Sequence, residues 1–510
     1  MQNKGNSAAH ETAGGTAGQA THVRTAIVGA GFSGMGMAVG LLDAGRDDFV
    51  IFERADSVGG TWRDNSYPNC RCDVPSHLYS FSFAPNPDWP ETYSPAAEIH
   101  AYQRRVAEDR GLLPFIRFDH EVLGADWDDD AARWRIETNH GTWTADFVVG
   151  AFGLLAEPVT PDIPGIETFA GEIMHSARWN HDHDLAGERV AVIGTGASAI
   201  QFVPGIQPTV GHMTVFQRTA PWVLPHRNRE ITKLERALYR RFPSLQRLVR
   251  NGVYYSRELV AAGMIRNKGV TEGAKKQGLA HISKSIRDPE LKAKVTPEFA
   301  PFCKRILLSD DYYTALDSPN VDLNVDGIAE IRPDAIVTQT GEVVEVDTIV
   351  LGTGFHVTDS PMMARFRNAE GHSITDVCDK NRLGAYNGTV VPTFPNLFVI
   401  PGPNTGIGHT SLIVMIEAQV GWVLKLIDAM EQRDLASVEV KQSVHDDWCD
   451  LMDAKTEPTV WNSGCSSWYL DKDGRNSTLW PGLTTEFRKR LRTVDLTKFD
   501  TVRRSPTRAA

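Results

Sequence analysis

Glycines at fixed spacing, found twice in the chain, are the residues with the clearest chemical meaning. Gly29, Gly31 and Gly34 follow an apolar run that starts at Val23, and small and apolar residues at helical spacing come after them. This order predicts a strand, a tight turn and a helix whose N-terminus faces a pyrophosphate. Glu53 ends the next apolar run, where a carboxylate can accept hydrogen bonds from ribose hydroxyls.

The second glycine loop differs from the first at the residues that would meet the ribose. It carries Gly194, Gly196 and Ala199, and its second strand ends in Gln217 and Arg218 instead of an acid. An arginine pairs with a 2'-phosphate that a carboxylate would repel, so this loop predicts NADPH. By elimination the first loop holds FAD. Two dinucleotides on one chain imply that hydride passes from NADPH to the flavin.

The two loops also organise the chain. They predict an α/β fold with two Rossmann-like dinucleotide-binding domains, the NADP domain inserted within the FAD domain, and a helical subdomain. A proline- and glycine-rich stretch at 151–165 suits the connection between the domains. The expected divisions are a disordered segment at 1–20, the FAD domain at 21–157 and 356–495, the NADP domain at 158–225 and 301–355, the helical subdomain at 226–300, and a flexible tail at 496–510.

Composition narrows the class of partner. The formal charge of -11 and the pI near 5.8 argue against nucleic-acid binding, which needs many lysines and arginines. We find neither an apolar run long enough for a membrane helix nor the apolar core of a signal peptide, so we expect a cytoplasmic protein with small-molecule partners. Residues 226–305 carry 19 Lys or Arg against 7 Asp or Glu. We interpret this block as the solvated basic face of the helical subdomain, in preference to a polyanion site.

The six cysteines are expected to be reduced thiols, because they are scattered through a long chain of cytoplasmic character. Cys70 and Cys72 form the one close pair, and no second Cys or His pair stands nearby at ligand spacing. The sequence therefore predicts no metal site.

Two further segments carry a resemblance to a known family. The segment with Phe169, Gly171, His175 and Trp179 resembles the FxGxxxHxxxW fingerprint of type I Baeyer-Villiger monooxygenases. The segment from Gly59 to Asp73 resembles that family's second long fingerprint, which runs from GGxW to an Asp. The resemblance extends from Val23 to about residue 490, and it departs from the family pattern at Asn69 and Asn180.

The resemblance implies an enzyme that uses NADPH, FAD and O2 to insert one oxygen atom next to a ketone carbonyl through a peroxyflavin, giving an ester or lactone. Arg305, which follows Lys304, would be the catalytic residue, because a fixed guanidinium stabilises a peroxide anion. Asp73 would orient Arg305, and Lys304 would join Arg218 at the NADPH phosphate. His175 and Trp179 would link domain movement to catalysis. The expected FAD contacts outside the first glycine loop are Gly60, Thr61, Trp62, Asp73, Tyr79 and Asn404.

Two other functions remain open at this stage. A flavin monooxygenase that oxidises nitrogen or sulfur would use a protonated hydroperoxide and would not need Arg305. A non-catalytic flavoprotein could act as a redox sensor, and it would not oxidise NADPH when a ketone is added.

Overall fold

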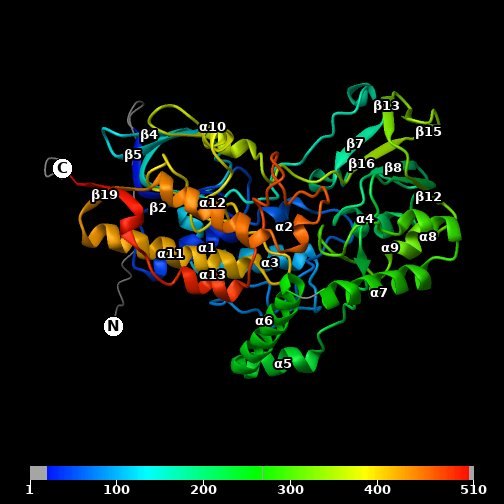
Figure 1. Ribbon diagram of the computed structural model, residues 1–510, viewed down its shortest axis with the longest axis horizontal. Coiled ribbons are helices and arrows are strands. Elements are labelled where there is room, and N and C mark those ends of the chain that lie inside the picture. Colours follow the sequence, from blue (N-terminus) through cyan, green and yellow to red (C-terminus); the bar gives the residue numbers. More distant parts are fainter. Residues whose placement is uncertain (1–19, 267, 505–510) are drawn as a thin grey trace, which may run out of the picture.

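The computed structural model describes residues 20–266 and 268–504 of the 510-residue chain. The predicted disordered segment therefore lies outside the described residues, apart from residue 20. The described chain forms two lobes, each built around a sheet with parallel strands (Figure 1). The strands of one sheet come from both ends of the chain, and those of the other come from its middle. This is the predicted class of fold, one Rossmann-like domain inserted within another.

The first sheet has the order β17-β4-β5-β6-β1-β2-β3, and β18 also pairs with β6. The strands β3, β2, β1, β6 and β18 run parallel, whereas β5 runs antiparallel to both of its neighbours, β6 and β4. The strand bounds are β1 Thr21–Val28, β2 Phe49–Phe52, β3 Ile116–Arg117, β4 Val122–Asp128, β5 Arg133–Thr138, β6 Gly141–Gly150, β17 Phe366–Arg367 and β18 Leu397–Val399.

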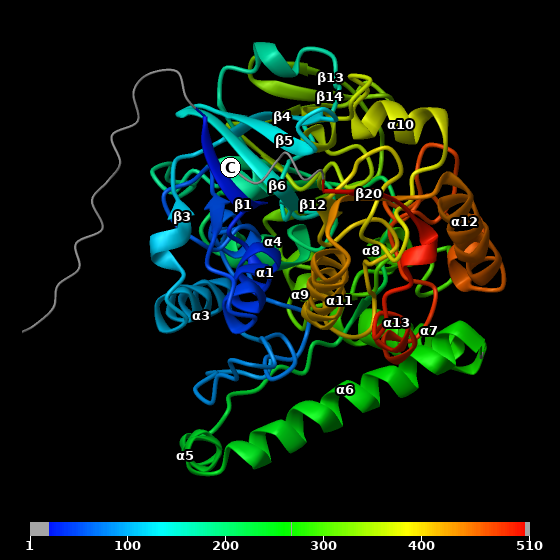
Figure 2. The same cartoon turned by 90° about the vertical axis from the view of Figure 1, so that its left-hand side faces the viewer.

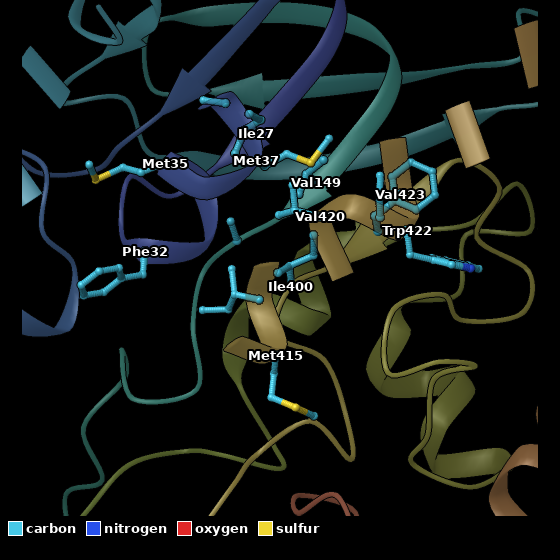
Figure 3. Packing of buried hydrophobic residues seen from close by; sticks show 14 of the residues in the cluster. Ile27, Phe32, Met35, Met37, Val149, Ile400, Met415, Val420, Trp422 and Val423 are labelled. Atoms are coloured by element: carbon cyan, nitrogen blue, oxygen red, sulfur yellow. The ribbon is translucent and has the colours of Figure 1, made fainter. Parts of the chain in front are cut away.

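The core of the first lobe lies between this sheet and two helices that are far apart in sequence. These are α1 (Phe32–Asp43) and α11 (Leu412–Gln432), which pack against each other. A Cβ at Gly40 would lie 2.8 Å from the Val420 side chain, so the glycine lets the two helices approach closely without displacing that side chain. Figure 3 shows Met35, Met37, Val420 and Trp422 in this buried cluster. The first lobe is thus complete only when α11 is in place.

The second sheet is entirely parallel, with the order β12-β9-β8-β16-β7. A three-stranded antiparallel sheet covers one of its faces, and two short helices cover the other. The bounds are β7 Glu172–His175, β8 Arg189–Ile193, β9 His212–Phe216, β12 Val321–Asn324, β16 Thr348–Leu351, β13 Ile328–Arg332, β14 Ala335–Thr338, β15 Val343–Glu345, α4 Ala199–Ile206 and α9 Tyr312–Leu316.

Between β10 (Val223–Leu224) and β11 (Leu307–Leu308), which pair with each other, the chain makes a helical excursion. Its helices are α5 Lys233–Arg241, α6 Pro243–Arg266, α7 Lys268–Ser285 and α8 Pro289–Val295. In Figures 1 and 2, α5 and α6 lie at the lower edge of the molecule. A capping box of Thr232 and Glu235 begins α5. Because β10 and β11 close this excursion, they fix the segment that carries Lys304 and Arg305.

The remaining helices and strands belong mainly to the first lobe. They are α2 Thr61–Asp64, α3 Ala96–Asp109, α10 Ile374–Lys380, α12 Gln442–Thr456, α13 Thr484–Arg490, β19 Leu435–Val440 and β20 Phe499–Arg503. The short 3-10 helices are η1 Leu113–Phe115, η2 Ile166–Thr168, η3 Ser176–Arg178, η4 Pro361–Arg365, η5 Val460–Asn462 and η6 Leu496–Lys498.

The prediction of a flexible tail at 496–510 is wrong for its described part. Residues of β20 pair antiparallel with β19, and Phe499 is buried against the first-lobe core. The short strand was hidden in the sequence because four of its five residues are exposed and it shows no apolar alternation. Within 20–266 and 268–504, no helix is long and apolar enough to cross a membrane.

Candidate active site

The first glycine loop has the geometry that a pyrophosphate requires. Gly29 has φ +106°, and a Cβ there would lie 2.6 Å from the carbonyl oxygen of Ala151. A Cβ at Gly34 would lie 1.9 Å from the carbonyl oxygen of Gly29, so this position allows the helix to pack on the loop. Gly31 is the N-cap residue of α1. A Cβ added there would have the Cα of Gly60, 3.9 Å away, as its nearest neighbour. The loop therefore offers free N–H groups beside open space, which fits the phosphates of FAD.

Glu53 lies at the end of β2, as predicted, and is buried beside this loop. Its carboxylate accepts hydrogen bonds from the backbone N–H of Ala30 (2.8 Å) and of Ala55 (3.1 Å) and from Nη1 of Arg63 (3.0 Å). A carboxylate has about four acceptor positions. Glu53 thus keeps room for a ribose hydroxyl while the protein holds its charge in place.

The other predicted FAD contacts gather next to the loop. Gly60, with φ +51°, caps α2, and Thr61 and Trp62 begin that helix. Trp62 Nε1 donates to the hydroxyl of Tyr79 at 3.0 Å, and burial raises the pKa of Tyr79 well above its usual value. Asn404, at φ +56°, instead uses its side-chain amide to donate to the carbonyl oxygen of Asn476, at 2.7 Å. Its side chain therefore anchors the C-terminal segment.

The second glycine loop repeats the geometry of the first. Gly194 has φ +108°, and a Cβ there would lie 2.5 Å from the carbonyl oxygen of Gly352. At Gly196 the nearest atom to a Cβ, the same oxygen, is 3.9 Å away. Ala199 begins α4 and is buried, with its Cβ beside Gly352. The third position here accepts a methyl group that the first loop excludes.

Two cations stand beside the second loop. Arg218 is exposed, and burial, together with the nearby charge of Arg218, lowers the pKa of Lys304. Among the described residues, neither forms an ion pair with a carboxylate. Gln217 is buried, and its Nε2 donates to the carbonyl oxygen of Lys294 at 2.8 Å. Unmatched cations at this point suit the 2'-phosphate of NADPH.

Arg305 and Asp73, predicted to be partners from segments 232 residues apart, are in contact. Both Nε (2.9 Å) and Nη2 (2.5 Å) of Arg305 donate to Oδ2 of Asp73. The side chains are partly buried, each about one quarter exposed, at 26%. The charge of Asp73 raises the pKa of the guanidinium above its ordinary value. Arg305 therefore remains a cation whose orientation is fixed.

Tyr469 is a third member of this site that sequence reasoning missed. It is buried, and its hydroxyl lies beside Arg305 and Asp73. Burial raises the pKa of the phenol to about 12, while the charge of Arg305 and a hydrogen bond with it act in the opposite direction. The phenol oxygen is thus placed to accept a hydrogen bond from the Arg305 guanidinium. No local pattern in the sequence singles out this tyrosine.

The expectation that all six cysteines are reduced is wrong for two of them. Cys303 and Cys465 form a disulfide, with Cα atoms 6.3 Å apart. Cys303 directly precedes Lys304, and Cys465 stands four residues before Tyr469. The bond joins the two segments that supply Arg305 and Tyr469. Within the described part of the chain, no group of His, Cys, Asp or Glu suited to a metal ion is found.

The loop that carries Asp73 is fastened to the second lobe through Gln201 of α4. Gln201 Oε1 accepts hydrogen bonds from the hydroxyl of Tyr67 and the backbone N–H of Arg71, both at 3.1 Å, and its Nε2 donates to the Arg71 carbonyl. Asn69 has φ +62°, a conformation that suits Gly or Asn, which accounts for the departure from the family pattern. The contact sets where Asp73 meets Arg305.

The fingerprint residues lie in the second lobe, away from Arg305. Phe169 packs against that lobe's core, and a Cβ at Gly171 would lie 2.0 Å from the carbonyl oxygen of Asp347. His175 ends β7, with Nε2 at 3.1 Å from the carbonyl oxygen of Gly354 in the connection back to the first lobe. Burial lowers the pKa of His175 to about 4, so the ring is neutral. Trp179 packs on Phe202 of α4.

Comparison with known proteins gives relatives over nearly the whole chain. A family model described as flavin-binding monooxygenase-like matches residues 22–259. A Baeyer-Villiger monooxygenase of Streptomyces coelicolor is 48% identical over 490 residues, which cover 95% of this chain and 94% of the relative. A Baeyer-Villiger monooxygenase of Pseudomonas aeruginosa is 43% identical over 487 residues, 95% of this chain and 92% of the relative.

Solved structures agree with these relatives. Cyclohexanone monooxygenase from Rhodococcus sp. Phi1, bound to NADP+, superposes with a TM-score of 0.85 at 28% identity, covering 95% of this chain and 100% of that one. An oxidized steroid monooxygenase bound to NADP has a TM-score of 0.83 at 29% identity, with the same coverage. The predicted fold class is confirmed.

Proposed function

The chain belongs to the Baeyer-Villiger monooxygenase family, and on that basis we propose that it inserts one oxygen atom of O2 beside the carbonyl of a small-molecule ketone, giving an ester or lactone. It is an FAD-dependent monooxygenase that consumes NADPH. Bound FAD supplies the electrons taken from NADPH and the activation of O2. The protein must hold both dinucleotides and stabilise the negative charge that develops beside the ketone.

Arg305 performs the second task in this proposal. The observation that carries it is the contact with Asp73 at the junction of the two lobes, which fixes a guanidinium between the segments assigned to FAD and to NADPH. An arginine keeps its charge at any working pH, and here Asp73 raises its pKa further. A preorganised cation of this kind stabilises an oxyanion by several kcal/mol, of the order of ~3.

Tyr469 acts on Arg305 as a positioning residue. Its phenol oxygen accepts a hydrogen bond from the guanidinium, so in this proposal Arg305 is oriented by Asp73 and by Tyr469 together. Two partners leave the long arginine side chain fewer rotamers, which lowers the entropy lost when the reacting groups are brought into line.

The cofactor residues divide between the two lobes. Gly29, Gly31, Gly34 and Glu53 would hold the FAD pyrophosphate and ribose, with Gly60, Thr61, Trp62, Asp73, Tyr79 and Asn404 around the rest of that cofactor. Gly194, Gly196, Ala199 and Gln217 would hold NADPH, with Arg218 and Lys304 on its 2'-phosphate. His175 and Trp179 would couple the placement of NADPH to the connection between the lobes, because His175 contacts Gly354.

The test is product analysis with a panel of ketones, NADPH and O2. Wild-type protein should form esters or lactones, and Arg305→Ala should reduce their rate by at least about a hundredfold while FAD stays bound. The matched control is Arg287→Ala: Arg287 Nε donates to Asp317 Oδ2 at 2.9 Å, as in the Arg305 pair, but Arg287 is 89% exposed. This variant should keep full activity.

Tyr469→Phe tests the positioning role separately. It should lower kcat and the yield of ester per NADPH about tenfold with an unchanged KM for NADPH, as expected when one hydrogen bond that aligns a catalytic group is lost. N-oxides or S-oxides without ester from any ketone would contradict the proposed reaction. Unchanged ester formation in Arg305→Ala would contradict the proposed site.

A further inference from the structure

The helix α6 exposes an apolar stripe on the side that faces away from the rest of the molecule. Leu248, Tyr255 and Leu259 are 67%, 62% and 76% exposed. They are seven and four residues apart, so they lie on one side of the helix. The opposite side is buried through Gln246, Tyr254 and Glu258. Figure 2 shows α6 along the lower edge of the molecule, with the body of the protein above it.

The stripe contains no charge, although the segment has charged residues. Between 248 and 259 these are Arg250, Arg257 and Glu258, and each binds the body of the protein. Arg250 donates to the carbonyl oxygens of His77 and Leu78, and Arg257 donates to the hydroxyl of Tyr93. Glu258 accepts hydrogen bonds from the backbone N–H and the hydroxyl of Thr484. A helix face that is meant for water normally carries charged residues, so three exposed large apolar residues here call for a partner.

Small, uncharged residues lie between the large ones. Asn251, Gly252 and Ser256 are exposed on the same side, and a Cβ at Gly252 would meet no atom within 4 Å. We propose that this stripe binds the same stripe of a second copy of the chain, with the two α6 helices antiparallel. In one register, Leu248 packs on the partner's Leu259 and Gly252 receives the ring of the partner's Tyr255. Both pairings recur after the two-fold rotation, as an isologous contact requires.

Charge and area agree with a second copy. Arg247, the exposed charge beside the stripe, meets the partner's Val260 in this register and lies about 20 Å along the helix from the partner's Arg247. That separation exceeds the Debye length of ~8 Å, so the like charges do not oppose the contact. The exposed parts of Leu248, Tyr255, Leu259 and Val260 offer on the order of 500 Å² per copy. The pair would bury about 1,000 Å², the lower end for a specific interface.

A membrane surface fits less well. Interfacial helices carry lysines and arginines along both edges of the apolar face, whereas Arg247 is the one exposed charge of the described α6 side chains beside this stripe, and its other neighbours are Asn251, Gly252 and Ser256. The area points to a dimer that forms and dissociates with concentration.

The first test measures the mass of the full-length, FAD-loaded protein by light scattering between about 1 and 100 µM. The wild type should shift from monomer to dimer over this range. Leu259→Glu should weaken the dimer at least about a hundredfold, because it brings two carboxylates into an apolar contact. Its flavin absorbance and NADPH oxidation should not change. The control is Leu123→Glu, at a leucine 46% exposed on β4, which should dimerise like the wild type.

The second test checks the register by cross-linking with a short bismaleimide. A mixture of Leu248→Cys and Leu259→Cys proteins should cross-link several-fold more than either variant alone, and the wild type gives the background of native thiols. A monomer at every concentration, or a dimer that survives in Leu259→Glu, would overturn the proposal. So would binding to vesicles of anionic phosphatidylglycerol that Leu259→Glu abolishes, since that result would assign the stripe to a membrane.

Discussion

The two glycine loops have nearly the same backbone conformation, but the residues that follow their second strands carry opposite charges. Their first glycines, Gly29 and Gly194, have φ values of +106° and +108°, and a Cβ on either would lie 2.6 Å or 2.5 Å from a carbonyl oxygen just past the end of the neighbouring strand. Beyond the turn they diverge: one ends in a buried acid with three donors, the other in Gln217 and an exposed arginine beside a lysine. The backbone thus suits a dinucleotide at both loops, and in the proposed assignment the residues after the second strand distinguish FAD from NADPH.

The largest effect should come from exchanging the residues at the third position of the loops. In Gly34→Ala the new Cβ would lie 1.9 Å from backbone, so the helix must move and FAD should be lost from the purified protein. Ala199→Gly removes a methyl group and should cost only about 1 kcal/mol of helix stability. The measurement is flavin absorbance per protein, with Gly421→Ala in α11, which has open space around it, as the control. Full flavin content in Gly34→Ala would refute the steric argument.

Removing the cation that distinguishes the second loop should have a moderate effect. Arg218→Ala should raise the KM for NADPH about 10- to 100-fold, as expected for one lost charge-assisted hydrogen bond, and should leave the KM for NADH within about threefold. Steady-state kinetics with both nucleotides gives the two values. Arg332→Ala, which removes an exposed arginine of the same lobe, should change neither. Equal losses with NADPH and NADH would contradict the assignment of Arg218 to the 2'-phosphate.

A smaller effect, on the pH dependence of the free energy of unfolding, should come from the buried His175 of the second lobe. Burial lowers the pKa of His175 to about 4, whereas an unfolded histidine titrates near 6.5. Between these values the unfolded chain binds more protons, so the free energy of unfolding falls as the pH is lowered through this window. His175 should account for roughly 1–2 kcal/mol of the loss between pH 7 and pH 5. Urea unfolding of wild type and His175→Asn at both pH values measures it, and an identical pH dependence would refute it.

Sequence reasoning predicted the structure correctly where a pattern is written in consecutive residues. The two glycine turns, the position of Glu53 at the end of β2 and the insertion of one domain within the other follow from such patterns, whereas the cofactor roles of Glu53 and Arg218 stay predictions. The contact of Arg305 with Asp73 was expected from the resemblance alone, since no physical rule joins residues 232 positions apart.

What the sequence did not reveal depends on long-range packing. Tyr469 lies beside Arg305 in a C-terminal segment that Asn404 and the disulfide fasten to distant parts of the chain. The pairing of Cys303 with Cys465 spans 162 residues, and composition argued for thiols. Strand β20 has mostly exposed residues and becomes a strand only because β19 provides an edge.

The insertion of one lobe within the other also sets the order in which the two lobes can be completed during synthesis. The strands of the second sheet, from β7 to β16, lie within 172–351 and emerge together. The first lobe must wait for α11, which ends at Gln432, before α1 is covered. At ~5–20 residues per second, that interval lasts about 20 to 80 seconds after Thr21 is made. During this interval the apolar side of α1 is exposed and can bind chaperones. It stays exposed in a nascent chain that stalls before residue 412.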